Sequence, residues 1–240
     1  MKAFRLDQSG LARLAGFLYL VLGVTAAFPQ MFVRPSVRVA GDAVATSHNI
    51  AANATLFRAA FAIDLVGVAS YALVALFLYA LLKSISPTMA LAMVVLASIG
   101  AAVMGANMLN HAAALLFATH AIYPAALGQH GSEGLALLAL DLHGIGVFIA
   151  QIFFGLWLLP LGYLVYRSNS FPRVLGILLA VGCFCYLADL LLVFLVPGPG
   201  RSVGQLVSMP AGIAEVLFAG WLFFKGMKTR DRAAGIVAHA

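Results

Sequence analysis

The chain has 240 residues, of which 63% are hydrophobic and only 9% charged, and its formal net charge is +6. A soluble domain carries roughly 25% charged residues, so a soluble fold of this size could not cover its surface with so few. The composition predicts an integral membrane protein whose partner is the lipid bilayer. The Lys and Arg residues lie at the ends of apolar segments rather than in one patch, so no nucleic-acid partner is expected.

Six apolar stretches are long enough to cross a bilayer. A hydrocarbon core about 30 Å thick needs roughly 20 helical residues at 1.5 Å each. Backbone in lipid must satisfy its own hydrogen bonds, so these stretches predict helices. The predicted spans are residues 11–28, 55–82, 87–119, 134–166, 172–196 and 210–224. The sequence therefore predicts an all-α, six-helix transmembrane bundle that forms a single domain over residues 1–226.

Prolines mark the predicted helix boundaries. Pro29 is expected to end the first span. Pro160 lies inside the fourth span and should kink it, freeing a carbonyl group near Leu156. Three others are expected in the first turn of a helix, where a missing amide hydrogen is tolerated. These are Pro87, Pro172 and Pro210.

The basic residues predict the orientation of the bundle. Ten Lys and Arg residues flank the spans on one side and four on the other, so the first side is expected to be cytoplasmic. With six spans, both termini then lie in the cytoplasm, and residues 227–240 form a basic tail that is expected to be disordered. The alternative is that the basic start and the apolar run up to Ala27 form a cleaved signal peptide.

The largest connection on the outer side covers residues 30–54. Asp42 is followed by Ala, Val, Ala and Thr, so its carboxylate could cap a short helix at the membrane interface.

Five of the predicted spans each carry one ionisable residue at a similar depth. Counted from their outer ends, all five lie roughly 9–14 Å below the membrane boundary. Ionisable groups inside a bilayer are costly, so each is a candidate functional residue. They are Asp64, His111, His143, Asp189 and Glu215. We interpret them as the lining of one polar cavity that opens to the outer side.

Helical spacing adds neighbours to this cavity. Asn107 lies four residues before His111, and Tyr186 lies three before Asp189, so each pair shares a helix face. Gln151 lies eight residues after His143 and could line a deeper part of the cavity.

Two charged residues near the outer ends of the spans extend this hypothesis. Arg58 begins the second span, and its charge could offset the carboxylate of Asp64, or its side chain could simply extend toward the headgroups. Asp141 is two residues from His143, so the two side chains point to nearly opposite sides; we expect His143 to face inward and Asp141 to meet water or Arg58.

The candidate catalytic residues are Asp64, His143, Asp189 and Glu215, and the candidate substrate-binding residues are Arg58, Asn107, His111, Gln151 and Tyr186. The sequence identifies no cofactor. Imidazole and carboxylate groups suit zinc or iron, and histidines from two helices could ligate a haem, but no single span carries a His-x-x-x-His or Glu-x-x-His pair. Polar groups that only hold helices in register are the structural alternative.

Several motifs resemble a known family. They are Leu56-Phe57-Arg58, Leu140-Asp141-Leu142-His143-Gly144, Phe153-Phe154-Gly155, Tyr163-Leu164-Val165-Tyr166-Arg167-Ser168 and Phe171-Pro172-Arg173-Val174-Leu175-Gly176. Together they resemble a bacterial multi-pass membrane family catalogued as a domain of unknown function, family 4386. The resemblance covers nearly the whole chain and implies a bacterial six-helix membrane protein, which we expect in the inner membrane. It implies no activity and no functional residues.

Three functions remain open at this stage. The polar cavity could belong to an enzyme that uses acid–base or metal-assisted chemistry on a lipid-like or isoprenoid substrate. It could instead bind a proton or cation coupled to transport of a small solute. The third possibility is a structural or sensor subunit without chemistry. The sequence leaves the oligomeric state undetermined.

Overall fold

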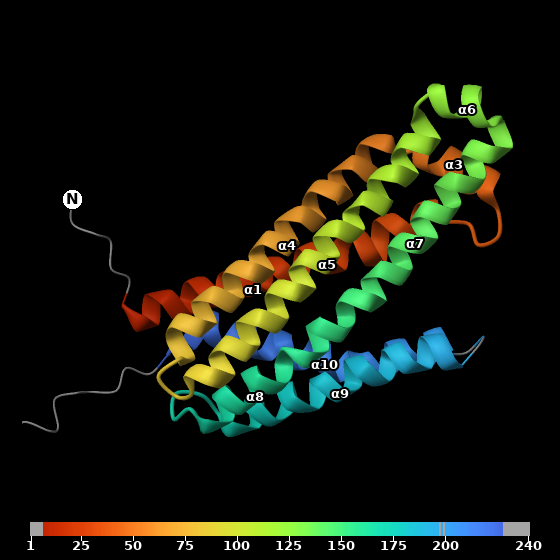
Figure 1. Ribbon diagram of the computed structural model, residues 1–240. Coiled ribbons are helices and arrows are strands. Elements are labelled where there is room, and N and C mark those ends of the chain that lie inside the picture. Colours follow the sequence, from red (N-terminus) through yellow and green to blue (C-terminus); the bar gives the residue numbers. More distant parts are fainter. Residues whose placement is uncertain (1–6, 197, 199, 228–240) are drawn as a thin grey trace, which may run out of the picture.

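The computed structural model describes residues 7–196, 198 and 200–227, and every regular element in these residues is helical. Six helical segments are long and apolar enough to cross a membrane, as predicted (Figure 1). The elements are α1 (Gln8–Phe28), the π-helix η1 (Pro29–Val33), α2 (Arg34–Val37), α3 (Ala43–Ala52), α4 (Ala54–Leu82), α5 (Pro87–Thr119), α6 (Ile122–Leu127), α7 (Gln129–Leu156), α8 (Leu158–Arg167), α9 (Arg173–Leu195) and α10 (Gly200–Lys225).

The first span continues beyond Pro29, which the sequence analysis placed at its end. Pro29 and Pro35 both lack an amide hydrogen, so the α-helical hydrogen-bond pattern is interrupted twice within seven residues. The chain turns between them as a π-helix, in which the Arg34 amide donates to the Pro29 carbonyl oxygen. The predicted 30–54 connection is consequently shorter, because residues 29–37 belong to the first span.

The prediction for Asp42 is confirmed. Its carboxylate accepts a hydrogen bond from the Ala45 amide at 2.9 Å and caps α3, which packs against α5 and α7.

Pro210 was wrongly predicted to begin the last span. Helix α10 begins at Gly200 and passes through Pro210. Proline within a membrane helix is tolerated where neighbouring groups satisfy the freed carbonyl. Pro160 acts as predicted, because the fourth span breaks at Trp157 into α7 and α8.

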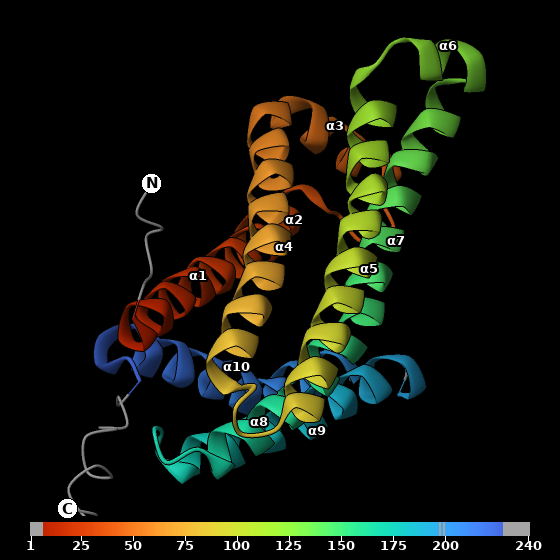
Figure 2. The same cartoon turned by 60° about the vertical axis from the view of Figure 1, so that its left-hand side comes forward.

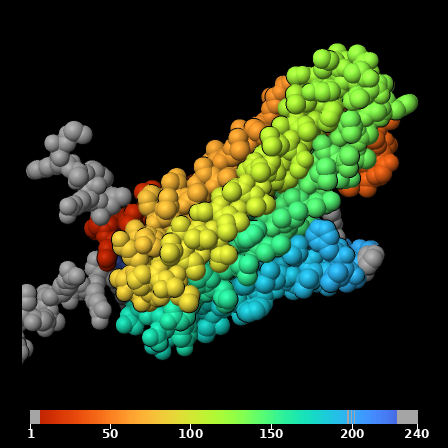
Figure 3. Space-filling model, viewed as in Figure 1, coloured from red at the N-terminus to blue at the C-terminus, as the bar shows by residue number. Residues whose placement is uncertain are grey.

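The spans form a closed ring, in the order α1, α4, α5, α7 with α8, α9 and α10, which returns to α1 (Figure 2). In the space-filling view α4, α5 and α7 form one continuous surface, with α9 along its edge (Figure 3). We call the end of the bundle that carries α3 and α6 the distal end. Gly226 and Ser9 lie side by side at the opposite end, so α1 starts and α10 ends on the same side. That this side is cytoplasmic stays a prediction.

Aromatic side chains fill the middle of the ring. Trp157, fully buried at the break between α7 and α8, lies with its ring centroid 5.7 Å from that of Tyr19 and 4.9 Å from that of Tyr71. Phe218 packs edge-on against Tyr19. The helix break thus places a large side chain where four helices meet. This aromatic cluster lies closer to the end of the bundle that carries the chain termini than the buried charges do.

Glycine allows α8 and α9 to approach closely. A Cβ atom at Gly176 would lie 2.6 Å from the Tyr166 amide nitrogen, closer than real Cβ contacts. Only glycine fits this backbone contact, which holds the terminal end of the ring together.

Candidate functional site

The buried polar residues form two networks. The distal network contains Gln30, Arg34, Phe57, Asp64, Asn107, His111 and His143. The central network contains Tyr19, Gln151, Tyr186, Asp189 and Glu215. No hydrogen bond or ion pair joins the two within the described ranges.

Arg34 is the centre of the distal network. It forms an ion pair with Asp64, and both side chains are less than a tenth exposed. Its second terminal nitrogen donates to the Gln30 side-chain oxygen at 3.1 Å. The π-helix brings Arg34 here, since its wider turn carries one residue more than an α-helical turn and rotates everything that follows. The pair neutralises two charges inside the bilayer.

His111 joins Arg34 to helix α4. Its Nε2 lies 2.9 Å from the Phe57 carbonyl oxygen, which can only accept, so Nε2 carries the hydrogen and donates. In the neutral ring Nδ1 is then an acceptor, and it lies 3.5 Å from the Arg34 guanidinium. The Phe57 ring stacks on the imidazole at a centroid distance of 3.9 Å. The tautomer and orientation of His111 are therefore fixed from both sides.

His143 reaches the network from α7. Its ring lies edge-on to that of His111 at 5.7 Å, and its Nδ1 lies 3.4 Å from the Asn107 carbonyl oxygen, to which it can donate. Asn107 in turn donates from its side-chain amide to the His143 carbonyl oxygen at 2.9 Å. Gly146 provides the space, because the Asn107 carboxamide occupies the position that a Cβ atom there would take. The remaining nitrogen, His143 Nε2, is buried without a partner and presents a lone pair.

Glu215 is the centre of the second network. The Tyr19 hydroxyl donates to Oε1 and the Tyr186 hydroxyl to Oε2, both at 2.7 Å. Three helices, α1, α9 and α10, thus meet at one carboxylate whose partners are neutral. Nearby, the buried Tyr71 hydroxyl has no hydrogen-bond partner.

Asp189 lies beside this group on α9. The Gln151 side-chain amide donates to its Oδ2 at 2.7 Å and to the Tyr186 carbonyl oxygen at 3.1 Å. Its Oδ1 is buried without a partner and faces the backbone of α10 at Gly204, where a Cβ atom would collide with it. Within the described residues, neither Asp189 nor Glu215 forms an ion pair.

The expectation of one shared cavity is wrong. The structure brings Asp64, His111, His143 and Asn107 together, but it places Asp189, Glu215, Gln151 and Tyr186 in the other network.

Glu215 lies farther along its helix than predicted. This residue lies fifteen residues after Gly200, whereas Asp64 lies ten after Ala54, about 22 Å and 15 Å along their helices. The error follows from placing the start of the last helix at Pro210.

The predicted partner of Asp64 was also wrong. Arg34, rather than Arg58, neutralises it, and Arg58 lies exposed without an ion pair among the described residues. Asp141 points away from His143 as predicted, but it pairs with Arg38 at 2.7 Å.

Three residues of the networks were missed: Gln30, Arg34 and Tyr19. The role of Arg34 could have been predicted from the sequence. A buried acid in lipid requires a cation, and this arginine follows directly on an apolar run.

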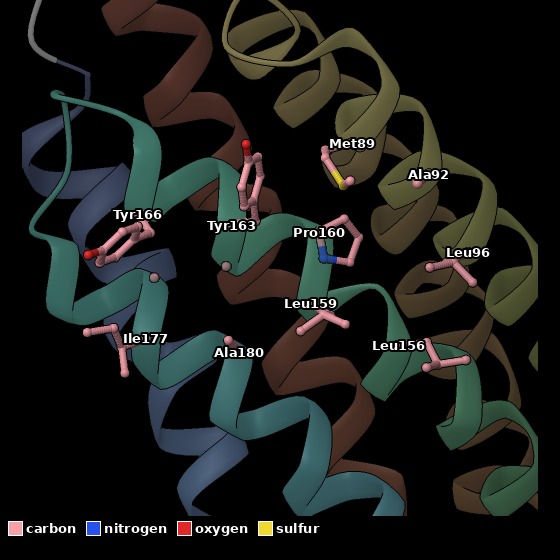
Figure 4. A pocket seen from close by; sticks show the side chains of 12 residues that line it. Met89, Ala92, Leu96, Leu156, Leu159, Pro160, Tyr163, Tyr166, Ile177 and Ala180 are labelled. Atoms are coloured by element: carbon pink, nitrogen blue, oxygen red, sulfur yellow. The ribbon is translucent and has the colours of Figure 1, made fainter.

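Neither of two cavities is lined by a buried carboxylate. The larger, about 570 Å³, lies between α5, α8 and α9 at the break near Pro160, and its walls are apolar except for Tyr163 and Tyr166 (Figure 4). The smaller, about 190 Å³, lies between α4 and α5 next to Arg58 and His111. No three His, Cys, Asp or Glu residues in the described parts of the chain are grouped to hold a metal ion.

The ring of apolar helices with charged groups enclosed in it defines a multi-pass α-helical membrane protein. A family model described as a domain of unknown function (DUF4386) matches residues 14–226, and the chain belongs to this family. The resemblance inferred from the sequence motifs is thereby confirmed.

One relative matches part of the chain. An uncharacterized protein from Archaeoglobus fulgidus is 40% identical over 83 residues, which are 35% of this chain and 48% of that protein. The chain thus spans about half the length of this relative. No solved structure matches the chain.

Proposed function

We propose that this protein is a carrier that binds a proton or small cation at Glu215 and Asp189 and couples its movement to that of a small solute. The observation that supports it most is the environment of Glu215, which has two tyrosine hydroxyls as partners and no cation among the described residues. We place the carrier in the plasma membrane of a bacterium, with both termini in the cytoplasm.

The two networks differ in how their charge is balanced. In the distal network Arg34 neutralises Asp64 permanently. In the central network the neutral donors Tyr19, Tyr186 and Gln151 stabilise carboxylates but cannot cancel their charge. An isolated charge in a low dielectric is unfavourable, so the central network gains stability when a proton or another cation binds. Intramembrane carboxylates in this situation often belong to ion pathways.

The second candidate is an acid–base enzyme that uses the distal network, with Asp64 and His143 as its catalytic groups. The unpartnered Nε2 of His143 supports it, since a lone pair beside a buried ion pair can accept a proton. Asn107 and His111, which belong to the same network, would then contact substrate. Against this candidate, the large apolar cavity that would suit a lipid-like substrate lies beside Pro160 and has no acid in its lining.

Charge displacement across a supported membrane tests the carrier without knowledge of its solute. Proteoliposomes adsorbed to a sensor receive a pH jump, and the transient current reports a proton entering the membrane. We expect a current from the wild type and at least a tenfold smaller one from Glu215→Gln and Asp189→Asn. The matched control is Asp141→Asn, which removes an acid from the exposed Arg38 pair and should leave the current unchanged.

Two results would refute the carrier proposal. One is a wild-type current no larger than that of protein-free liposomes. The other is a Glu215→Gln current equal to the wild type, in protein shown to be folded by its unchanged melting temperature. Should Glu215→Gln fail to fold, Tyr19→Phe and Tyr186→Phe provide the same test, because each removes one donor to the carboxylate.

A further inference from the structure

The smaller cavity has almost entirely apolar walls, and Arg58 is one of its lining residues. It lies between the distal halves of α4 and α5 and has a volume of about 190 Å³. Its lining residues are Arg58, Phe61, His111, Ala112, Leu115 and Leu116. Arg58 is exposed, whereas His111 is fully buried and forms part of the inner wall.

Arg58 is available to bind an anion. The acid that the sequence suggested as its partner, Asp64, is paired with Arg34. The exposed Asp141 is paired with Arg38. Arg58 therefore presents its guanidinium at the distal end of α4 with no ion pair among the described residues, and a guanidinium binds carboxylate oxygens in a bidentate manner.

The apolar wall continues away from Arg58. Phe61 lies one turn below Arg58 on α4, and Leu65 follows four residues later on the same face. On α5, Leu109 lies three residues before Ala112. Leu65 and Leu109 are 41% and 74% exposed, so both helices present an apolar side chain to the lipid below the cavity.

We propose that this cavity binds the carboxylate end of a single-chain fatty acid, with Arg58 holding the carboxylate and Phe61, Leu115 and Leu116 contacting the first carbons of the chain. The cavity is smaller than the roughly 300–1,000 Å³ that encloses a whole drug-sized ligand, so it takes only one end of the molecule. The rest of the chain follows Leu65 and Leu109 into the bilayer. This site is independent of the proposed proton binding at Glu215.

The position of His111 gives the site a connection to the distal network. Its ring lines the cavity, while its Nδ1 lies beside Arg34 and its Nε2 donates to the Phe57 carbonyl oxygen. The cavity thus lies next to a residue whose hydrogen bonds hold the first span against α4.

Equilibrium binding of radiolabelled palmitate to the full-length protein in a neutral detergent tests the proposal. We expect saturable binding of one molecule per chain. Arg58→Gln should weaken it by about 10- to 100-fold, the range for losing a hydrogen bond to a charged group. Arg58→Lys should retain most of the affinity. The matched control is Lys83→Gln, which removes a charge from the other end of α4 and should leave binding unchanged.

A second variant tests the cavity without touching its charge. Ala112→Leu places a larger apolar side chain on the wall and should reduce palmitate binding at least tenfold while the melting temperature stays near that of the wild type. Methyl palmitate, which lacks the negative charge, should compete poorly with palmitate.

Three results would overturn the fatty-acid site. The first is equal palmitate affinity in the wild type and Arg58→Gln. The second is competition by methyl palmitate as strong as that by unlabelled palmitate. The third is displacement of palmitate by a two-chain anionic phospholipid at lower concentration than by palmitate itself, which would assign Arg58 to the surrounding bilayer lipid.

Discussion

The distal and central networks contain similar residue types but differ in whether a buried carboxylate has a positively charged partner. In the distal network the Asp64 carboxylate meets the Arg34 guanidinium, and both are buried. In the central network Glu215 meets only two tyrosine hydroxyls, and Asp189 meets only the Gln151 amide in the described residues. The first arrangement is complete without a further ion. The second is not, and this difference separates a structural charge in a membrane from one that can take part in ion binding.

Removal of the Asp64 charge should have the largest effect on stability. Asp64→Asn leaves Arg34 buried without a counter-charge, which costs about 3–5 kcal/mol when one partner of a buried pair is removed. Denaturation by sodium dodecyl sulfate, followed by circular dichroism, measures the loss. The double variant Arg34→Met with Asp64→Leu should recover most of it, because it removes both charges. A single variant as stable as the wild type would contradict the assignment of Arg34 as the structural cation.

Gly146→Ala should disturb the distal network through its geometry rather than its charge. The new methyl group would collide with the Asn107 carboxamide and force it away from the His143 carbonyl oxygen. Overpacking of this kind costs about 1–3 kcal/mol. The control is Gly144→Ala, since a Cβ atom there has no neighbour within 4 Å. Equal losses of stability in the two variants, measured in the same denaturation assay, would show that the loss does not arise from displacement of Asn107.

Glu215→Gln should have a smaller effect on stability than Asp64→Asn. The Gln side chain has the same shape and removes a charge that the central network does not neutralise. The exchange of charged for neutral hydrogen bonds to Tyr19 and Tyr186 is worth about 1 kcal/mol, offset in part by the lower desolvation penalty. If Glu215→Gln destabilises the protein as strongly as Asp64→Asn, the two networks do not differ in the way proposed.

Arg38→Gln should have the smallest effect. Its pair with Asp141 is more than a third exposed on both sides, and exposed pairs contribute about 0–1 kcal/mol. High salt should reduce even this contribution, which distinguishes it from the buried Arg34 pair. A salt-independent loss above about 2 kcal/mol would contradict the surface character of the pair.

The helical bundle could be predicted from the sequence because hydrophobic length and proline position depend on local properties. The break at Pro160 and the opposite faces of Asp141 and His143 were predicted for the same reason. The partner of Asp64 could not be found this way, because it depends on whether the first helical span ends at Pro29 or continues through it. Assigning Pro210 to a first turn likewise misplaced Glu215, since a proline can lie inside a membrane helix when its neighbours compensate.

The π-helix at Pro29–Val33 makes the Arg34–Asp64 pair depend on how the chain winds at this point and not only on residue identity. If the same residues wound as an α-helix, Arg34 would be rotated by about 100° around the helix axis and would no longer face Asp64. One residue fewer in this segment would allow α-helical winding and keep the arginine on the same side, because an α-helical turn holds one residue less than a π-helical turn. Among relatives, a one-residue gap here would therefore mark loss of the π-helix and remain compatible with the buried ion pair.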